Sequence, residues 1–323
     1  MSATGASSSA KSRGIAAIFL LTVILFAVLP YLLSTYYLGL VIEILIFALF
    51  AMSLDLLIGY TGMASLGHAA YFGVAAYAVG LLSLKLHWSV WSALPAALII
   101  VTLVAALFGL LALRTRGSYF LMITLALSQV AWGIAFGWHS LTGGDDGLPD
   151  VPRPALASDW SLAGDRSFYF FVLLLAGTGM LLLAHVAMSP FGFALRGIRE
   201  SETRMQALGY NVWRYKFAAF ILAAAFAGLA GALYAYYNRF VSPDYLQVFR
   251  SAEVLLMVIL GGAGTLIGPA IGAAVIVLLE NVISAYTERW LIVIGTIYIL
   301  VALFAPGGII GFIRELRGRR VKS

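Results

Sequence analysis

Long runs of apolar residues, separated by short polar segments, follow one another along almost the whole chain. A run of 18 or more apolar residues is long enough to cross the roughly 30 Å hydrocarbon core of a bilayer as a helix. The pattern therefore predicts a series of membrane-spanning helices. The predicted spans are 15–33, 38–58, 64–84, 91–113, 119–138, 168–188, 217–237 and 286–304, with a longer apolar segment at 252–283.

The segment 252–283 is too long for one crossing, because its residues would extend about 48 Å as a helix. Its middle reads GGAGTLIGP, residues 261–269, and glycine and proline interrupt helices. Irregular backbone at membrane depth is tolerated where it is buried in protein or lines a wet cavity. We therefore expect two crossings here. The fold class is then all-α, a polytopic membrane protein with about ten transmembrane helices that include broken or re-entrant segments.

Basic residues support this topology. With ten crossings, 14 of the 20 Lys and Arg fall on the side of the N-terminus, which the positive-inside rule places in the cytoplasm together with the C-terminus. The first apolar run is too long for a signal peptide and no small-residue cleavage site follows it, so we expect an uncleaved span. The expected organisation is a cytoplasmic tail 1–13, a transmembrane domain 14–306 with a cytoplasmic loop 189–216 and an outer loop 139–167, and a basic cytoplasmic tail 307–323.

Composition excludes several classes of protein. The chain is 62% hydrophobic and 11% charged, with a mean hydropathy of +0.99, which leaves too little polar surface for a soluble fold. It has no cysteine, so disulfides and thiolate metal sites are excluded. It contains no Gly-Lys pair, so it has no P-loop of its own. We expect no catalytic site, no cofactor and no metal. We also expect no nucleic-acid partner, because the net charge of +6 comes from lysines and arginines in the loops.

Three carboxylates, Glu43, Asp55 and Glu280, fall within apolar spans. A charge at mid-bilayer costs about 2.5–3.5 kcal/mol on insertion scales, so such side chains face the bundle interior or reach water near a helix end. These carboxylates leave one alternative function open. The chain could be an ion-coupled secondary transporter that uses them as a proton or cation site. His68 and His185 also lie within or near spans, where hydrogen-bonded structural roles are typical.

Small residues recur at intervals of about four in GYTGMASLGHAAYFGVAAYAVG, residues 59–80, and in FAAFILAAAFAGLAGALYA, residues 217–235. Such spacing lets helix backbones approach closely in a membrane. Together with broken helices, it is typical of transporters that line a central pathway. The candidate pathway residues are Gly62, Ser65, Gly67, His68, Gly261, Gly262 and Gly264.

The segment SPFGFALRGIRESETRMQALGYN, residues 189–211, is charged and amphipathic between two apolar spans. Ser189 before Pro190 is typical of a helix start, and Gly209 of a helix end, so we expect one short cytoplasmic helix. It could lie on the anionic inner leaflet. The Pro-Phe-Gly corner and the mixed charge favour the other reading, insertion into a groove of a partner protein.

Four blocks resemble, in order, those of permease subunits of ATP-binding-cassette (ABC) importers of the branched-chain amino acid type. They cover most of the chain, from about residue 50 to 285. The SPFG and TGGDDGL sequences point to the M-type subunit rather than its H-type partner. The blocks are GYTGMASLGHAAYFGVAAY, TGGDDGLPDVPRP, SPFGFALRGIRESETRMQALGYNVWRYK and GGAGTLIGPAIGAAVIVLLE.

The resemblance implies a pathway-forming subunit in a bacterial inner membrane. Its partners would be a second permease, two cytoplasmic ATP-binding subunits that move segment 191–209 as a lever, and a periplasmic solute-binding protein. Met63 stands where Gln is usual in the family and Asp55 where Asn is common, so branched-chain amino acids, urea, short amides and aromatic acids all stay open as solutes. The expected coupling residues are Pro190, Phe191, Gly192, Leu195, Arg196, Arg199, Glu200 and Gly209.

Overall fold

The computed structural model of the chain describes residues 26–157, 160–162 and 164–287, with short pieces at 289, 292–293, 295–296, 299 and 307–311. Most of the predicted spans 15–33 and 286–304 and of the two predicted tails lies outside these residues, so those assignments stay predictions.

The described chain is helical apart from one short antiparallel pair of strands. The helices are α2 (Thr35–Thr61), α3 (His68–Lys85), α4 (Val90–Ala112), α5 (Ser118–Gly137), α6 (His139–Thr142), α7 (Asp165–Met188), α8 (Pro190–Glu200), α9 (Glu202–Ala207), α10 (Val212–Asn238), α11 (Val248–Gly261) and α12 (Ile267–Tyr286). Two short 3₁₀ helices, η1 (Gly144–Asp146) and η2 (Pro243–Leu246), and the strands β1 (Ala155–Ala157) and β2 (Trp160–Ser161) complete the elements.

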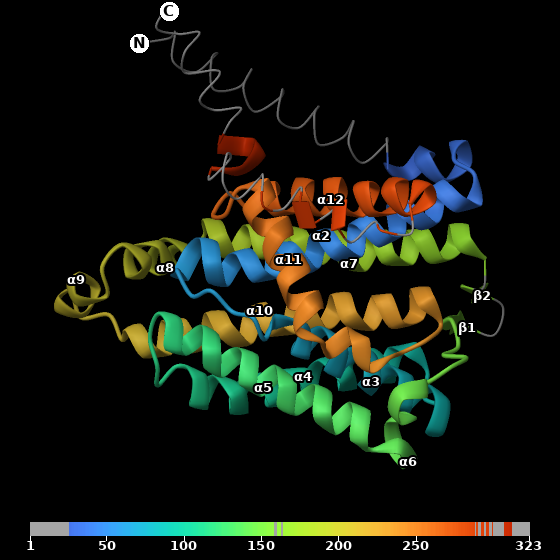
Figure 1. Cartoon of the computed structure of the whole chain (residues 1–323), viewed down its shortest axis with the longest axis horizontal. Coiled ribbons are helices and arrows are strands. Elements are labelled where there is room, and N and C mark those ends of the chain that lie inside the picture. The colour runs from blue at the N-terminus through green and yellow to red at the C-terminus, as the bar shows by residue number, and fades with distance from the viewer. Residues whose placement is uncertain are drawn as a thin grey trace, which may run out of the picture.

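The long helices form two layers that run along the long axis of the molecule (Figure 1). One layer holds α2, α7 and α12, and the other holds α3, α4, α5 and α10. Helix α2 joins the layers because it packs against α7 and α12 as well as against α10. Helix α11 crosses between them and contacts α12, α2 and α3. One end of the bundle carries α8 and α9 and is called the α8 end; the other carries α6, β1 and β2 and is called the α6 end.

In the part of the chain that the structure describes, six helices, α2, α4, α5, α7, α10 and α12, are each long and apolar enough to cross a membrane. The surface of α4 shows how they meet lipid. Its buried face carries small side chains at every fourth position, Ala93, Ala97, Val101 and Ala105. Its exposed face carries large apolar ones, such as Leu103 at 66% exposure. Small residues inside and large apolar residues outside are typical of a helix between a bundle and a bilayer.

Two further passes combine a short helix with an extended segment. Residues 62–67 start at the α8 end, and α3 continues to the α6 end, where the Lys85 ammonium donates to the Ser140 and Leu141 carbonyls at 2.9 and 3.0 Å. Residues 239–247 start at the α6 end, and α11 continues in the opposite direction to the α8 end.

Segment 239–247 is fixed at the α6 end by the loop that follows α6. Val241 and Leu148 form an antiparallel bridge, with N–H to carbonyl distances of 2.8 and 3.0 Å. Between residues 35 and 286 the described chain therefore passes along the bundle eight times. The count of about ten stays a prediction, because the remaining two crossings fall mainly outside the described residues.

The structure corrects the start of the predicted span 64–84. Helix α3 begins only at His68, because α2 ends at Gly62 in a left-handed conformation with a φ of 74°. Glycine adopts this conformation at little cost, and a left-handed residue cannot continue a helix. The apolar pattern hid the break because the non-helical residues Met63 and Ser65 are buried as well.

The predicted division of segment 252–283 is confirmed. Helix α11 ends at Gly261 and α12 begins at Ile267, and the turn between them holds Gly262 and Gly264 with φ angles of 106° and 83°. Helix α11 starts at Val248 and has 14 residues. It therefore extends about 21 Å, less than the thickness of a bilayer core, and needs segment 239–247 to complete its pass.

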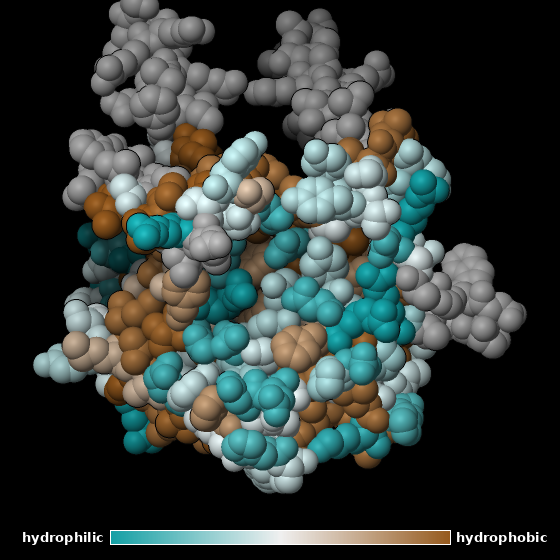
Figure 2. Space-filling model, turned by 45° about the vertical axis from the view of Figure 1, so that its right-hand side comes forward, coloured by the Kyte–Doolittle hydropathy of each residue, from teal (hydrophilic) through white to brown (hydrophobic). Residues whose placement is uncertain are grey.

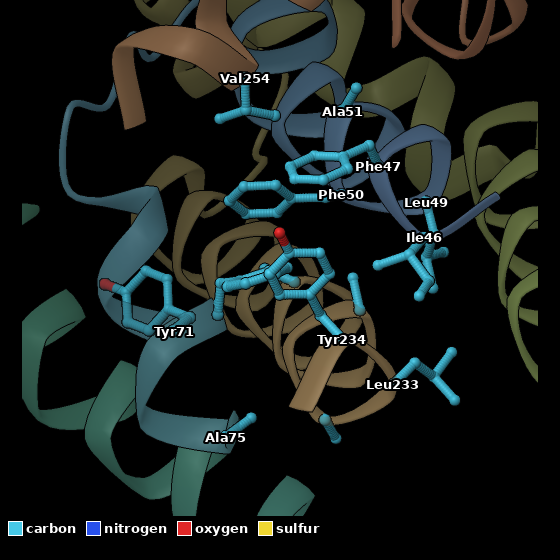
Figure 3. Close-up of a cluster of buried hydrophobic side chains, with 14 of the residues drawn as sticks. Ile46, Phe47, Leu49, Phe50, Ala51, Tyr71, Ala75, Leu233, Tyr234 and Val254 are labelled. Carbon is cyan, nitrogen blue, oxygen red and sulfur yellow. The ribbon is translucent and has the colours of Figure 1, made fainter. Parts of the chain in front are cut away.

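Aromatic side chains fill the centre of the bundle, where α2, α3, α10 and α11 meet (Figure 3). The ring centroids of Phe50 and Phe72 are 4.7 Å apart, and those of Phe47 and Tyr234 are 5.4 Å apart. Figure 3 shows Phe47 and Phe50 of α2 between Val254 of α11 and Tyr234 of α10. These contacts hold the two layers together at mid-depth.

Candidate functional site

Helix α8 begins where the sequence predicts. The Ser189 hydroxyl accepts a hydrogen bond from the Gly192 N–H at 3.5 Å, and Pro190 fills the first helical position, where its missing N–H removes no helical bond. Gly192, Leu195 and Ile198 are buried on the face that packs against the bundle. The opposite face is exposed at the α8 end.

The single helix expected over 190–209 is wrong, because the chain breaks at Ser201. That residue is extended, with φ −162° and ψ 105°, and its hydroxyl accepts from the Arg204 N–H at 3.3 Å to begin α9. Serine side chains compete with helical hydrogen bonds in this way. The predicted end is confirmed. Gly209 has a φ of 86°, and its N–H donates to the Gln206 carbonyl at 2.9 Å.

Arg196 and Arg199 connect α8 to the C-terminal end of α2. The Arg199 guanidinium donates to the Gly59 carbonyl. Arg196 donates to the Tyr60 hydroxyl at 3.2 Å, and its guanidinium carbon lies 4.7 Å from the centroid of the Tyr60 ring. The last carbonyls of a helix carry partial negative charge, so guanidinium groups are favoured beside them. These contacts tie α8 to α2.

Arg199 also reaches two non-helical segments, residues 62–67 and the turn between α11 and α12. A Cβ atom on Gly62 would lie 3.3 Å from Arg199 Cγ, and one on Gly264 would lie 3.2 Å from Arg199 Nη1. Gly62 opens the extended segment 62–67, and Gly264 lies in the turn between α11 and α12. One side chain of α8 therefore contacts the starts of two irregular segments that belong to different parts of the sequence.

Asp55 holds the turn between α11 and α12 from the side of α2. Its carboxylate accepts hydrogen bonds from the Gly264 N–H at 2.6 Å and the Leu266 N–H at 3.0 Å. The side chain is fully buried. Because the free N–H groups at a helix start favour a negative group, Asp55 stabilises the start of α12. It also compensates for Leu266, which has the unfavourable φ of 61°.

Candidate coupling and pathway residues meet at a groove of about 570 Å³ at the α8 end. Its walls come from the end of α2, the turn between α4 and α5, α8 with α9, and the start of α10. An ion pair between Lys216 and Glu202 closes one side. Its lining includes Gly62, Met63, Arg116, Arg199, Glu200 and Trp213.

Three other candidate pathway residues, Ser65, Gly67 and His68, lie deeper and are buried. Ser65 accepts from the Gly67 N–H at 3.2 Å, and a side chain at Gly67 would overlap the Thr124 carbonyl. The His68 ring stacks on Phe50, with centroids 5.4 Å apart. Its Nε2 lies 2.8 Å from the Ser53 hydroxyl. In this conformation these three positions serve close packing at the start of α3.

His68 has one further feature. The Ser53 hydroxyl donates its proton to the Phe50 carbonyl at 2.6 Å, so His68 Nε2 carries the hydrogen that Ser53 accepts. His68 Nδ1 is then a buried acceptor with no donor among the described residues. Nearby, the Ser251 hydroxyl of α11 accepts from the Ala69 N–H at 2.9 Å, which places the starts of α3 and α11 side by side.

A second polar group lies toward the α6 end and is built around α11. Arg250 donates to Glu253 at 2.7 Å, and its guanidinium carbon lies 5.4 Å from the Phe47 ring centroid and 5.9 Å from that of Tyr234. Glu43 and Glu280 are within electrostatic reach of this pair. No group of three His, Asp or Glu in the described part of the chain is arranged to hold a metal ion.

A cavity of about 380 Å³ opens beside this group at the α6 end. Glu43, Asn238 and Asn281 line its inner part, and the ion pair of Arg153 with Asp165, at 2.7 Å, lies at its side. Figure 2 shows that hydrophilic side chains gather on this end of the molecule, with hydrophobic ones at the flanks. Both ends of the bundle therefore carry a polar hollow.

Residues 36–302 match the family described as the branched-chain amino acid transport system permease component. The chain belongs to this family of permeases. It is 27% identical to the high-affinity branched-chain amino acid transport system permease protein LivM of Escherichia coli K12, over 92% of this chain and 75% of LivM. The LivM protein of Salmonella typhimurium gives 26% over the same shares. The LivH protein of Salmonella typhimurium gives 26% over 82% of this chain and 91% of LivH.

The match to LivM confirms the resemblance to a LivM-like, multi-pass membrane permease. No solved structure matches the chain.

The predicted coupling residues of the permease divide into two groups. Gly192 and Leu195 are buried, and Phe191 stacks on Tyr215 at 5.5 Å, so these three hold α8 in place. Pro190, Arg196, Arg199, Glu200 and Gly209 are exposed at the α8 end.

Sequence reasoning missed two features of the permease. Phe193 is 60% exposed on the outer face of α8, where an apolar residue between the buried Gly192 and Ala194 was the available signal. Arg250 and Glu253 were also missed. Their spacing of three residues places them on one face of a helix, but the apolar run around them was taken to begin at Ala252.

Proposed function

We propose that this permease is a transmembrane subunit of an ATP-binding-cassette importer that forms the pathway for branched-chain amino acids or similar small polar solutes. The observation that carries the proposal is the position of Arg199. It joins the exposed helix α8 to the end of α2, to segment 62–67 and to the turn before α12. A displacement of α8 would therefore reach both broken segments at once.

The ATPase contact is proposed at the exposed face of α8 and α9. Phe193 and Leu208 are exposed at 60% and 67% on a surface that also carries the exposed charges of Arg196, Glu200 and Arg204. An exposed apolar residue at the tip of a short helix is typical of insertion into a groove of a partner. Two cytoplasmic ATP-binding subunits would bind here and at the equivalent helix of a second permease.

The remaining partners follow from the same assignment. The second permease is proposed to be an H-type subunit, in line with the similarity to both LivM and LivH proteins. A periplasmic solute-binding protein would deliver solute to the cavity at the α6 end. The proposed location is the bacterial inner membrane, with both termini and α8 in the cytoplasm.

The test is reconstitution in sealed vesicles. We expect solute uptake only when the permease is assembled with its ATPases, its partner permease and its binding protein and is supplied with ATP. Uptake by the permease alone, driven by a proton or sodium gradient, would overturn the proposal in favour of the ion-coupled transporter.

The same assembly tests the linkage through Arg199. We expect Arg199→Glu to abolish uptake while ATP hydrolysis and membrane insertion continue, because the reversed charge is repelled by the Gly59 carbonyl. Arg114→Glu is the matched control, since it reverses an exposed charge at the same end without touching α8. Wild-type uptake by the Arg199 variant contradicts the linkage.

A further inference from the structure

The ion pair on α11 leaves one carboxylate oxygen without a partner. Glu253 is 3% exposed, and its Oε2 accepts from Arg250 at 2.7 Å. Its Oε1 has no hydrogen-bond donor among the residues that the structure describes. A buried carboxylate oxygen without a donor is costly, and native structures pair the great majority of such atoms.

Two further carboxyl groups lie near this pair. Glu43 of α2 and Glu280 of α12 are within electrostatic reach of Arg250 and Glu253. The Arg250 guanidinium carbon also lies beside the Phe47 and Tyr234 rings, 5.4 and 5.9 Å from their centroids. An ammonium group would donate to the Glu253 oxygen that lacks a donor, and the aromatic faces would stabilise it further.

The cavity at the α6 end gives access to this cluster. Glu43 lines the cavity, as do the amide groups of Asn238 and Asn281. Glu43 also interacts electrostatically with Arg250 and Glu253, so it connects the cavity with the buried pair. Beyond the pair lies the aromatic centre of the bundle (Figure 3), which offers apolar contacts to a side chain.

We propose that Glu253, with Glu43 and Glu280, binds the ammonium group of an amine-bearing solute, so that the permease itself excludes uncharged solutes such as urea and simple amides. This inference rests on the proposed function and specifies its solute class. Selection then occurs twice, once in the binding protein and once at the entrance to the membrane.

Uptake by the assembled importer tests the inference. The probes are L-leucine, 4-methylpentanoate, which differs from L-leucine only in lacking the amine, 4-methylpentanamide and urea. We expect ATP-driven uptake of L-leucine alone. Glu253→Gln keeps the shape of the side chain but loses its charge, and should slow leucine uptake by about tenfold or more, because a charged hydrogen bond is lost.

A second measurement does not depend on transport. We expect a hydrophobic carbodiimide to modify Glu253 in the assembly without ATP. Mass spectrometry measures the fraction of Glu253 that is modified. L-Leucine should reduce this modification, whereas 4-methylpentanoate should not. The exposed Asp150 in the same sample is the control, since it lies outside the proposed site and no solute should change its modification.

The outcomes separate the inference from the proposed function. ATP-driven uptake of urea or of 4-methylpentanamide by the wild-type assembly overturns the inference and leaves the importer function standing. Leucine uptake at the wild-type rate by Glu253→Gln also overturns the inference. Equal protection of Glu253 from the carbodiimide by L-leucine and by 4-methylpentanoate overturns it as well. Uptake that needs no ATPase overturns the importer function itself.

Discussion

Asp55 and Arg199 hold the same stretch of backbone from two sides. The carboxylate binds the N–H groups of the turn before α12, and the guanidinium contacts that turn and the end of α2. The chain thereby places a negative and a positive group where helix ends favour each of them. Asp55 is committed to structure by these bonds, which argues against a proton-carrying role for it.

A change at Asp55 tests this assignment. We expect Asp55→Ala to lower the free energy of unfolding by roughly 3 kcal/mol or more, because two hydrogen bonds to a charged acceptor are lost. Thermal unfolding of the purified protein, followed by tryptophan fluorescence, measures the change. Asp55→Asn keeps one acceptor and should lose less stability and retain ATP-driven uptake. Loss of uptake by a stable, assembled Asp55→Asn variant would point instead to titration of this carboxyl group.

Local chemistry made some residues predictable. The start of α8 at Ser189 and Pro190 and the left-handed Gly209 follow from side chains that act on their immediate neighbours. The partners of Asp55 lie 209 and 211 residues away in the sequence, so no local pattern identifies them. Arg199 was expected to face a partner protein, and only the fold reveals its bond to Gly59.

Among the elements, α3 and α10 approach closely at a glycine of α10. A Cβ atom on Gly231 of α10 would overlap the backbone of Phe72 of α3. Gly177 of α7 lies on a comparable apolar helix, but a Cβ there would meet no atom within 4 Å. Gly231 therefore marks a close contact between two helices, whereas Gly177 stands where a larger side chain would have room.

These two glycines make a matched pair of substitutions. We expect Gly231→Ala to destabilise the protein by about 1–3 kcal/mol, because the helices must move apart. Gly177→Ala should be neutral or stabilise by up to about 1 kcal/mol, since alanine favours a helix. Thermal unfolding midpoints measure both. Equal effects of the two substitutions contradict the close contact between α3 and α10.

Periodicity predicted the long helices and missed the short breaks. The divided segment around Gly262 was found because several glycines and a proline stand together. The extended residues 62–67 and the break at Ser201 were missed, because each depends on one residue whose conformation the fold selects. Helix α11 was placed too late for a related reason, since Arg250 in its first turn is compensated by Glu253 one turn later and by side chains of α2 and α10.

For the whole molecule, orientation in the bilayer is the assignment that most needs a measurement. The chain has no cysteine, so a single introduced cysteine reports sidedness without a background. We expect Phe193→Cys on α8 to react with a membrane-impermeant maleimide only from the cytoplasmic side. Asp146→Cys, exposed at the α6 end, should react only from the opposite side. Labelling of both from the same side contradicts the proposed topology.

The starts of α3 and α11 meet at mid-depth, joined by the bond from the Ala69 N–H to the Ser251 hydroxyl. Each helix start carries a partial positive charge. A bare proton or sodium ion that passes the carboxyl groups around Arg250 would then meet two such charges, which oppose its passage. The amino acid of the proposed function brings its own carboxylate and would avoid that barrier. An importer built in this way would conduct a nutrient while the electrochemical gradient of the cell stays sealed against leakage.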